Sequence, residues 1–294
     1  MFRSLTGFGQ FISVERGFML FMISLGATFL IEKNLSWFQA IYLGFIVFCG
    51  WCGVDAMNNI YDVDLDAKSD PVRAEYTKDI GRIGVCVSIL FCALSISLGI
   101  ITWIPLVPVL TLIGILVGVS YSVPPFRLRQ TICKPLVNLS VGAIPVLMVA
   151  ALSSVFSASV ISLVFLIGVT TAVNSLWEDL ADYASDSNSR ARTMPIVLGF
   201  ERGLYLTIVM GYCLIPFMVL VGILFQLNTL YYLVFSALVT YMSLRLIQKR
   251  SVLFGKSRND KESVRKLGET LAKDFVIIAI LQTTNLMLSS YLAL

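Results

Sequence analysis

The chain has 294 residues, of which 57% are hydrophobic and only 14% are charged. A soluble domain carries about 25% charged residues, so this composition excludes a soluble enzyme, a disordered chain and a secreted disulfide scaffold. The net charge of +4 provides no basic field large enough to suggest nucleic acid as a partner. Histidine is absent, which excludes a histidine general base and His-ligated zinc or haem.

Long apolar runs in the sequence predict membrane-spanning helices. A helix needs about 20 apolar residues to cross a ~30 Å hydrocarbon core, and only a helix or a closed barrel satisfies its backbone there. No run alternates with the period of a strand, so we expect an all-α polytopic membrane protein. The runs predict about nine spans in a single bundle: 16–31, 37–60, 81–101, 103–121, 134–152, 156–176, 203–225, 228–247 and 273–291.

The distribution of charge predicts the orientation of these spans. Of the 22 Lys and Arg residues, only Lys33 falls in a connection that follows an odd-numbered span. The positive-inside rule therefore places the N-terminus and the charged connections on the cytoplasmic side, in the cell or plasma membrane if the source is prokaryotic. Of the 18 acidic residues, only Glu32 lies on the other side, and the cytoplasmic acids concentrate at two helix ends.

The first concentration lies where the second predicted span ends. Asn58, Asp62 and Asp66 are spaced i, i+4, i+8, which places them along one stripe of a helix. Asp55 lies on the same stripe, deeper in the membrane. We call Asn58, Asp62 and Asp66 the first cluster.

A turn with basic side chains is predicted between the fourth and fifth spans. Pro124 and Pro125 prevent a helix from continuing and favour an extended turn. Arg127 and Arg129 follow the prolines, and Lys134 lies at the start of the next predicted helix.

A second concentration of acids ends the sixth predicted span. Glu178, Asp182 and Asp186 repeat the i, i+4, i+8 spacing. Carboxylates stacked in this way repel one another by a few tenths of a kcal/mol per pair, and the cost rises beside lipid. One such group would be explained by solvated helix-end acids, but two matching groups on one side of the membrane indicate a bound divalent cation.

Magnesium suits these groups because it prefers carboxylate oxygens and shares its coordination with phosphates. Arg73 follows the first group of acids and Arg192 follows the second. Acids that hold magnesium beside Arg and Lys side chains describe a diphosphate site.

At these residues the sequence resembles the UbiA superfamily of intramembrane prenyltransferases. Its N-x-x-x-D-x-x-x-D signature is met by the first cluster, followed by Arg73. Its D-x-x-D-x-x-x-D signature is met by Asp179, Asp182 and Asp186, which we call the second cluster, followed by Arg192-Thr193-Met194-Pro195. Its Y-S-x-P-P-x-R-L-K segment is met by residues 121–129, with Arg129 in place of Lys.

The resemblance implies a single transmembrane prenyltransferase domain over residues 1–294. It implies Mg²⁺-dependent ionisation of a prenyl diphosphate to an allylic cation, and transfer of the prenyl group to a small or lipophilic acceptor. Each cluster is then expected to hold one Mg²⁺, and the expected catalytic residues are Asp62, Asp66, Asp182, Asp186 and Tyr121, which the motif places beside the site. The expected diphosphate contacts are Arg73, Arg127, Arg129, Lys134 and Arg192.

Several alternatives remain open from the sequence. The acceptor could be an aromatic acid, a quinone precursor, a glycerol ether or another lipophilic molecule. A terpene cyclase of the same superfamily would use the same ionisation, and a cation transporter is a more remote alternative because transport favours acids near the bilayer midplane. The roles of Glu178 and Asp55 are also open. Membrane lipid is the one further partner expected.

Overall fold

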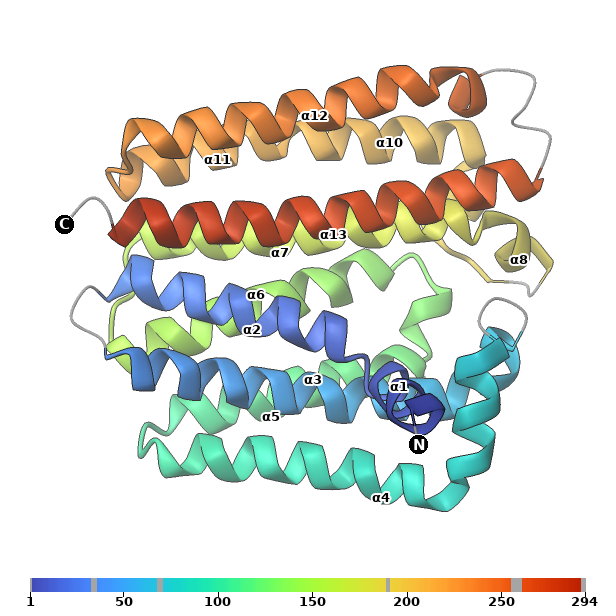
Figure 1. The fold of residues 1–294 in the computed structure, drawn as a ribbon, viewed down its shortest axis with the longest axis horizontal. Helices are drawn as coiled ribbons and strands as arrows, with labels where there is room; N and C mark the ends of the chain where they lie inside the picture. The colour runs from blue at the N-terminus through green and yellow to red at the C-terminus, as the bar shows by residue number, and fades with distance from the viewer. Residues whose placement is uncertain (1, 33–35, 68–70, 189–190, 255–260, 292–294) are drawn as a thin grey trace. The chain divides into compact units, whose positions relative to one another are not determined.

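The computed structural model describes residues 2–32, 36–67, 71–188, 191–254 and 261–291. Within these ranges the chain folds into helices and contains no strand, which confirms the all-α prediction. The course of the helices can be followed in Figure 1.

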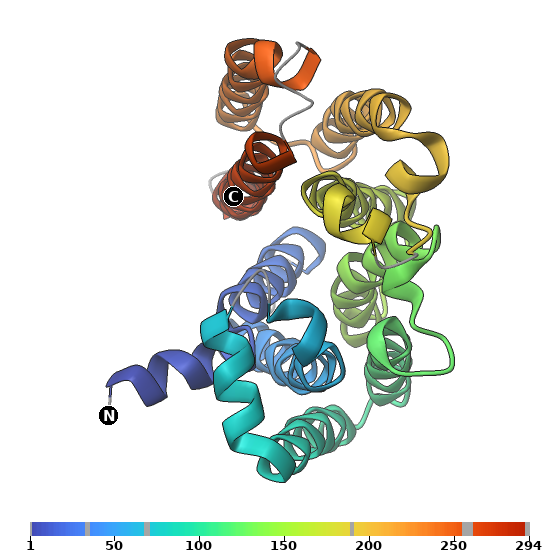
Figure 2. The same ribbon diagram turned by 90° about the vertical axis from the view of Figure 1, so that its right-hand side faces the viewer.

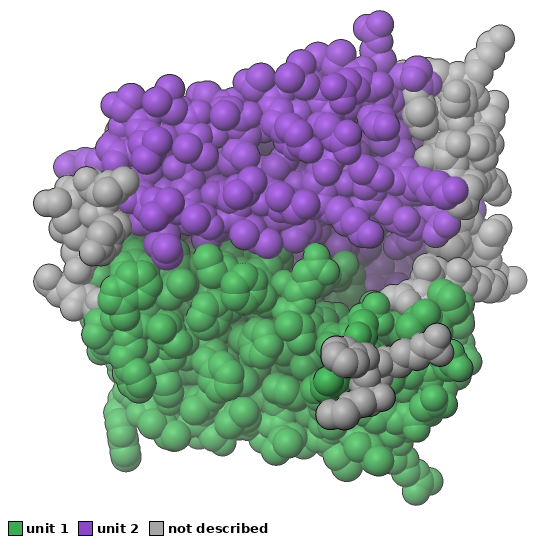
Figure 3. Space-filling model, viewed as in Figure 1, with its two compact units in different colours: residues 1–128, 143–156 green, residues 129–142, 157–294 purple. Residues whose placement is uncertain are grey.

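The structure divides into two compact units, coloured separately in Figure 3. Unit 1 comprises residues 1–128 and 143–156, and unit 2 comprises residues 129–142 and 157–294. The helices of unit 1 are α1 (Phe2–Phe11), α2 (Val14–Ile31), α3 (Trp37–Asp66), α4 (Pro71–Ile101) and α5 (Leu106–Ser122). Helix α6 (Lys134–Ser153) contributes its first half to unit 2 and its second half to unit 1. That these units form one domain stays a prediction.

The other helices of unit 2 follow in chain order. They are η1 (Leu128–Gln130, of which Leu128 belongs to unit 1), α7 (Ala158–Ala181), α8 (Tyr183–Asn188), α9 (Met194–Leu198), α10 (Phe200–Tyr212), α11 (Leu214–Leu224), α12 (Thr229–Phe254) and α13 (Lys261–Tyr291).

Eight helical segments in the described part of the chain are long and apolar enough to cross a membrane. Helices α10 and α11 together form one of these segments, Phe200–Leu224. The ninth predicted span is α5, an apolar helix of 17 residues. Each predicted span therefore corresponds to an apolar helix of the structure.

Small residues hold α3 and α4 together in unit 1. The hydroxyl groups of Ser88 and Ser95 donate hydrogen bonds of 2.7 Å to the carbonyls of Gly53 and Ile46 on α3. A Cβ atom at Gly53 would lie 2.8 Å from the backbone nitrogen of Cys92, so only glycine permits this approach. Helices that pack in lipid commonly use small residues and interhelical hydrogen bonds in this way. The packing fixes α3, which carries the first cluster.

Helix α4 bends sharply at Gly81. This residue has φ 50° and ψ −126°, a conformation that only glycine adopts without strain. The first segment of α4, residues 71–80, therefore runs across the direction of the second, as Figure 1 shows. The sequence predicted a connection before residue 81, and the structure instead forms a helix there.

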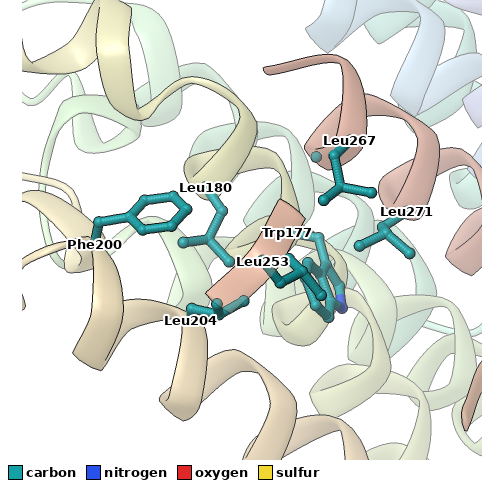
Figure 4. A pocket seen from close by; sticks show the side chains of 8 residues that line it. Trp177, Leu180, Phe200, Leu204, Leu253, Leu267 and Leu271 are labelled. Carbon is teal, nitrogen blue, oxygen red and sulfur yellow. The ribbon is translucent and has the colours of Figure 1, made fainter. Parts of the chain in front are cut away.

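Helix α7, the central helix of unit 2, contacts α10, α11 and α13. Trp177 and Leu180 on α7 line an apolar pocket together with Leu204 on α10 and Leu271 on α13 (Figure 4). These four side chains are buried. They anchor the last turn of α7, which carries Asp179 and leads into Asp182.

Candidate functional site

The first cluster lies at the C-terminal end of α3. This helix begins with a capping box formed by Ser36 and Gln39 and continues unbroken to Asp66. Asn58 is 8% exposed and Asp62 only 1% exposed. The side chain of Asp66 lies outside the described part of the structure. The continuous helix places Asn58, Asp62 and Asp66 in the predicted i, i+4, i+8 register.

Arg127 is the basic partner of the first cluster. Helix α5 ends at Ser122, and the Pro124–Pro125 turn leads into Arg127, as the sequence predicted. An Nη2 atom of Arg127 lies 3.4 Å from Oδ1 of Asp62. The Arg127 side chain is 37% exposed, so water reaches one side of this ion pair.

The structure gives Asp55 a partner outside the first cluster. The hydroxyl of Ser13, in the joint between α1 and α2, donates a hydrogen bond to Oδ2 of Asp55. Asn59 donates to the carbonyl of Phe11 at 2.7 Å and lies 3.5 Å from the same Asp55 oxygen. Asp55 thus joins the α1–α2 connection to α3, an arrangement that supports a structural role for this residue.

Asp179 and Lys134 form a buried ion pair in unit 2. Nζ of Lys134, the first residue of α6, lies 2.5 Å from Oδ1 of Asp179 near the end of α7. Their side chains are 7% and 0% exposed. The second carboxylate oxygen of Asp179 is buried and accepts no hydrogen bond from any described residue. A buried oxygen without a donor is costly, and a cation would compensate it.

Asp182 and Asp186 continue the second cluster across a bend. Helix α7 ends at Ala181, Asp182 forms the bend, and Asp186 lies on α8. The hydrogen bonds from Asp182 N to Glu178 O and from Asp186 N to Asp182 O maintain the helical register across it. The predicted single helical stripe is therefore bent at its second acid.

Burial raises the pKa of both Asp182 and Asp186. The neighbouring carboxylates of Asp186 and Glu178 push the pKa of Asp182 in the same direction, while Lys134 and Arg129 lower it. The charged forms of these two carboxylates are therefore less stable than they would be in water, mainly because they are buried. A bound cation would lower this electrostatic cost.

The loop after α8 holds Arg192 near the second cluster. The backbone N–H of Arg192 donates to the carbonyl of Gln130 at 2.8 Å, next to Arg129 in η1. The Arg192 side chain itself is exposed. The two remaining candidates lie in unit 1: Arg73 is half-buried on the first segment of α4, and Tyr121 is half-buried in the last turn of α5.

Two hydrogen bonds to acids of the candidate site were not predicted from the sequence. The hydroxyl of Thr193 donates to Oδ2 of Asp186 at 3.0 Å, and the side-chain amide of Asn174 donates to Glu178 at 3.3 Å. Thr193 lies within the Arg-Thr-Met-Pro motif, so its proximity to the site had a signal in the sequence. Asn174 lies four residues before Glu178 on the same helix, a spacing that brings the two side chains together and could have predicted this contact.

The oxygen-rich chemistry of both clusters fits magnesium. Oδ1 of Asn58 and Oδ2 of Asp179 are buried oxygens that no described residue donates to. Amide and carboxylate oxygens are ligands that hard divalent cations use. Among the described side chains, no three acids, cysteines or histidines converge as a preformed metal site. Asp62 and Asp179 are instead paired with Arg127 and Lys134.

Comparisons with known proteins agree with the sequence motifs. A family model described as the UbiA prenyltransferase family matches residues 19–253. Over 121 residues the chain is 31% identical to a rice protein (Oryza sativa subsp. japonica) named as a probable homogentisate phytyltransferase 2 of the chloroplast. This match covers 39% of the chain and 32% of the rice protein, so the chain spans about a third of that relative.

Solved structures share the fold over nearly the whole chain. A UbiA homologue from Aeropyrum pernix K1 has a TM-score of 0.69 at 13% identity, covering 94% of this chain and 98% of that one. A UbiA homologue from Archaeoglobus fulgidus, bound to GPP and Mg²⁺, has a TM-score of 0.65 at 17% identity, covering 93% and 99%. A structure described for digeranylgeranylglyceryl phosphate synthase has a TM-score of 0.67 at 16% identity, covering 98% of both chains.

At these identities the solved structures establish the fold. Together with the eight apolar helical segments, they make the chain a multi-pass integral membrane protein. The match of the family model covers most of the sequence and both units. The resemblance drawn from the three motifs is confirmed, and the chain belongs to the UbiA prenyltransferase family.

Proposed function

We propose that this protein transfers a prenyl group from a prenyl diphosphate to a small or lipophilic acceptor in an Mg²⁺-dependent reaction. Membership of the family supports this activity, as do two clusters of buried oxygens, each beside basic side chains. The observation that carries the proposal is the buried, unpartnered oxygen of Asp179 beside Lys134. That combination suits a cation together with an anionic headgroup.

The residues divide into two roles. Asn58, Asp62 and Asp66 would hold one Mg²⁺, and Asp179, Asp182 and Asp186 would hold the other. When bound, these ions would offset the negative charge that develops on the departing diphosphate. The residues expected to contact the diphosphate oxygens directly are Arg73, Arg127, Arg129, Lys134 and Arg192.

The basic side chains assist departure because they are already positioned. Carboxylates hold Lys134 and Arg127 beside the two clusters, so both positive charges are already close to where a diphosphate would bind. Preorganised charges of this kind stabilise developing negative charge more effectively than water does. Tyr121 is proposed to lie beside the reacting diphosphate, and the allylic cation must be kept from water because water would convert it to the alcohol.

Aromatic acids are the first class of acceptor to test. The partial similarity to a homogentisate phytyltransferase makes homogentisate the first candidate. We propose that both clusters face the cytoplasm, following the excess of Lys and Arg in the connections on that side. The diphosphate would then be drawn from the cytoplasmic side of the membrane.

The activity is tested with purified full-length protein in lipid nanodiscs. Geranyl, farnesyl, geranylgeranyl and phytyl diphosphates are each combined with homogentisate and other acceptors, and products are identified by mass spectrometry. Prenylated acceptor formed with Mg²⁺ and lost in excess chelator is the expected result. A hydrocarbon formed without acceptor would identify a terpene cyclase instead.

A binding measurement keeps the test independent of the acceptor. A prenyl thiolodiphosphate, which ionises slowly, should bind in the presence of Mg²⁺ and not in its absence. Equal binding under both conditions would contradict the proposed role of the metal. Movement of Mg²⁺ across a proteoliposome membrane, with no diphosphate binding, would favour the transporter.

A further inference from the structure

Asp179 and Asp62, one carboxylate from each cluster, both form ion pairs but differ in how deeply the pairs are buried. Nζ of Lys134 lies 2.5 Å from Oδ1 of Asp179, and both side chains are almost completely buried. Arg127 and Asp62 are 3.4 Å apart, and 37% of the arginine side chain is exposed. The Lys134–Asp179 pair therefore lies in a low-dielectric environment, whereas water reaches the Arg127–Asp62 pair.

This difference determines how easily a divalent cation can displace each basic side chain. Attraction between charges strengthens as the surrounding dielectric falls, and a buried charge that loses its partner is strongly destabilised. Arg127 can turn toward water when a metal ion takes Asp62. Lys134 has no such route from its buried position. The nearby carboxylates of Asp182 and Asp186 would be taken by the same metal ion, so Lys134 needs a replacement anion. A diphosphate supplies that anion.

Building on the proposed function, we propose that Lys134 serves as a built-in cation for Asp179 and makes the two clusters fill in order. The first cluster binds its divalent ion without substrate. The second cluster binds its ion only together with a diphosphate, which takes Lys134 away from Asp179. Closure of the second metal site is thereby coupled to the arrival of the prenyl diphosphate headgroup.

The order is tested by counting bound Mn²⁺ with electron paramagnetic resonance. The probes are Mn²⁺ alone and Mn²⁺ with inorganic pyrophosphate, applied to full-length protein in nanodiscs. Wild-type protein should bind one ion without pyrophosphate and two with it. In Lys134→Met the second ion should bind without pyrophosphate, with an affinity at least about tenfold above that of wild type. Two wild-type ions of equal affinity without pyrophosphate would overturn the inference.

Matched variants separate this effect from a general change in charge. Lys78→Met removes the same charge from the exposed pair with Asp64, whose atoms are 3.1 Å apart, and should leave Mn²⁺ binding unchanged. Lys134→Arg retains the charge and should keep the wild-type order. Asp179→Asn should lose the second ion even with pyrophosphate, and retention of both ions in that variant would contradict the assignment.

Thermal unfolding covers the case in which Lys134→Met is unstable. In EDTA this variant should unfold at a lower temperature than wild type, and Mn²⁺ alone should restore most of the loss. Without pyrophosphate, wild type binds Mn²⁺ only at the first cluster and should therefore be stabilised by Mn²⁺ less than the variant is. A variant that Mn²⁺ does not rescue would count against the inference. Failure of wild type to bind Mn²⁺ even with pyrophosphate would instead refute the proposed function.

Discussion

At the scale of single residues, burial separates the acids expected to act from those that are solvated. Asp62 and Asp64 lie two residues apart at the end of α3, yet the side chain of Asp62 is 1% exposed and that of Asp64 is 87% exposed. Water already stabilises the charge of Asp64, which also pairs with Lys78. Only the buried carboxylate gains substantially from a bound cation.

Replacement of Asp62 by Ala should therefore lower turnover at least about a hundredfold, because a charge that fixes the diphosphate site is lost. Asp182→Ala should have the same effect. Prenyl transfer is measured on protein that purifies with a normal elution profile. Asp64→Ala is the matched control and should retain near-normal activity. If Asp62→Ala and Asp64→Ala behaved alike, the assignment of the first cluster would be wrong.

Asp55 should act on stability and leave metal binding unaffected. Asp55→Ala removes the acceptor of the Ser13 hydroxyl and a neighbour of Asn59, which should cost about 1–3 kcal/mol of unfolding free energy. Asp55→Asn keeps an acceptor oxygen and should restore most of the loss. The Mg²⁺ concentration that gives half-maximal activity should stay within twofold in both variants. A tenfold increase would make Asp55 part of the metal site.

At the scale of elements, Gly81 fixes the direction of the segment that carries Arg73. Gly81→Ala imposes a side chain on a backbone with φ 50°, which should cost about 1–3 kcal/mol although no atom lies within 4 Å of the new Cβ. The segment 71–80 should shift, and the KM for prenyl diphosphate should rise. Gly211→Ala is the control because Gly211 lies in a regular helix with its nearest neighbour 3.9 Å away. Equal KM values for both variants would indicate that Arg73 does not contribute to binding of the prenyl diphosphate.

The elements that could be predicted from the sequence are those defined by a run of apolar residues. All nine predicted spans appear as apolar helices, eight of them in segments long enough to cross a membrane, because lipid leaves the backbone no alternative to a helix over such a run. The helix over residues 71–80 was missed because charged residues interrupt its apolar pattern. The bend at Asp182 was missed because neither glycine nor proline marks it, and the i, i+4 hydrogen bonds continue through it.

At the scale of the molecule, the sequence predicted candidate residues for the site but not how they pair. The motifs identified Asp62, Arg127, Lys134 and Asp179 as candidates. The pairs that they form join residues 65 and 45 positions apart, and only the folded chain determines such contacts. Burial, which distinguishes the two pairs, is also a property of the fold. The structure therefore adds the difference on which ordered metal binding depends.

The orientation in the membrane can be tested within unit 1 alone. The second segment of α4, residues 82–101, has a length of about 30 Å at 1.5 Å per residue and thus spans the hydrocarbon core. Lys78 precedes this segment and Trp103, which is 90% exposed, follows it. Figure 2 shows the two segments of α4, in teal, from a second side. The two residues should therefore lie on opposite sides of the membrane, with Lys78 in the cytoplasm.

Single cysteines introduced into a variant without the six native cysteines test this arrangement. A membrane-impermeant maleimide should label Trp103→Cys in intact cells. It should label Lys78→Cys only after the membrane is permeabilised. The opposite pattern would invert the proposed orientation and place the first cluster away from the cytoplasmic supply of prenyl diphosphate. Labelling of both positions from one side would show that α4 does not cross the membrane, and the unmodified cysteine-free protein provides the background signal.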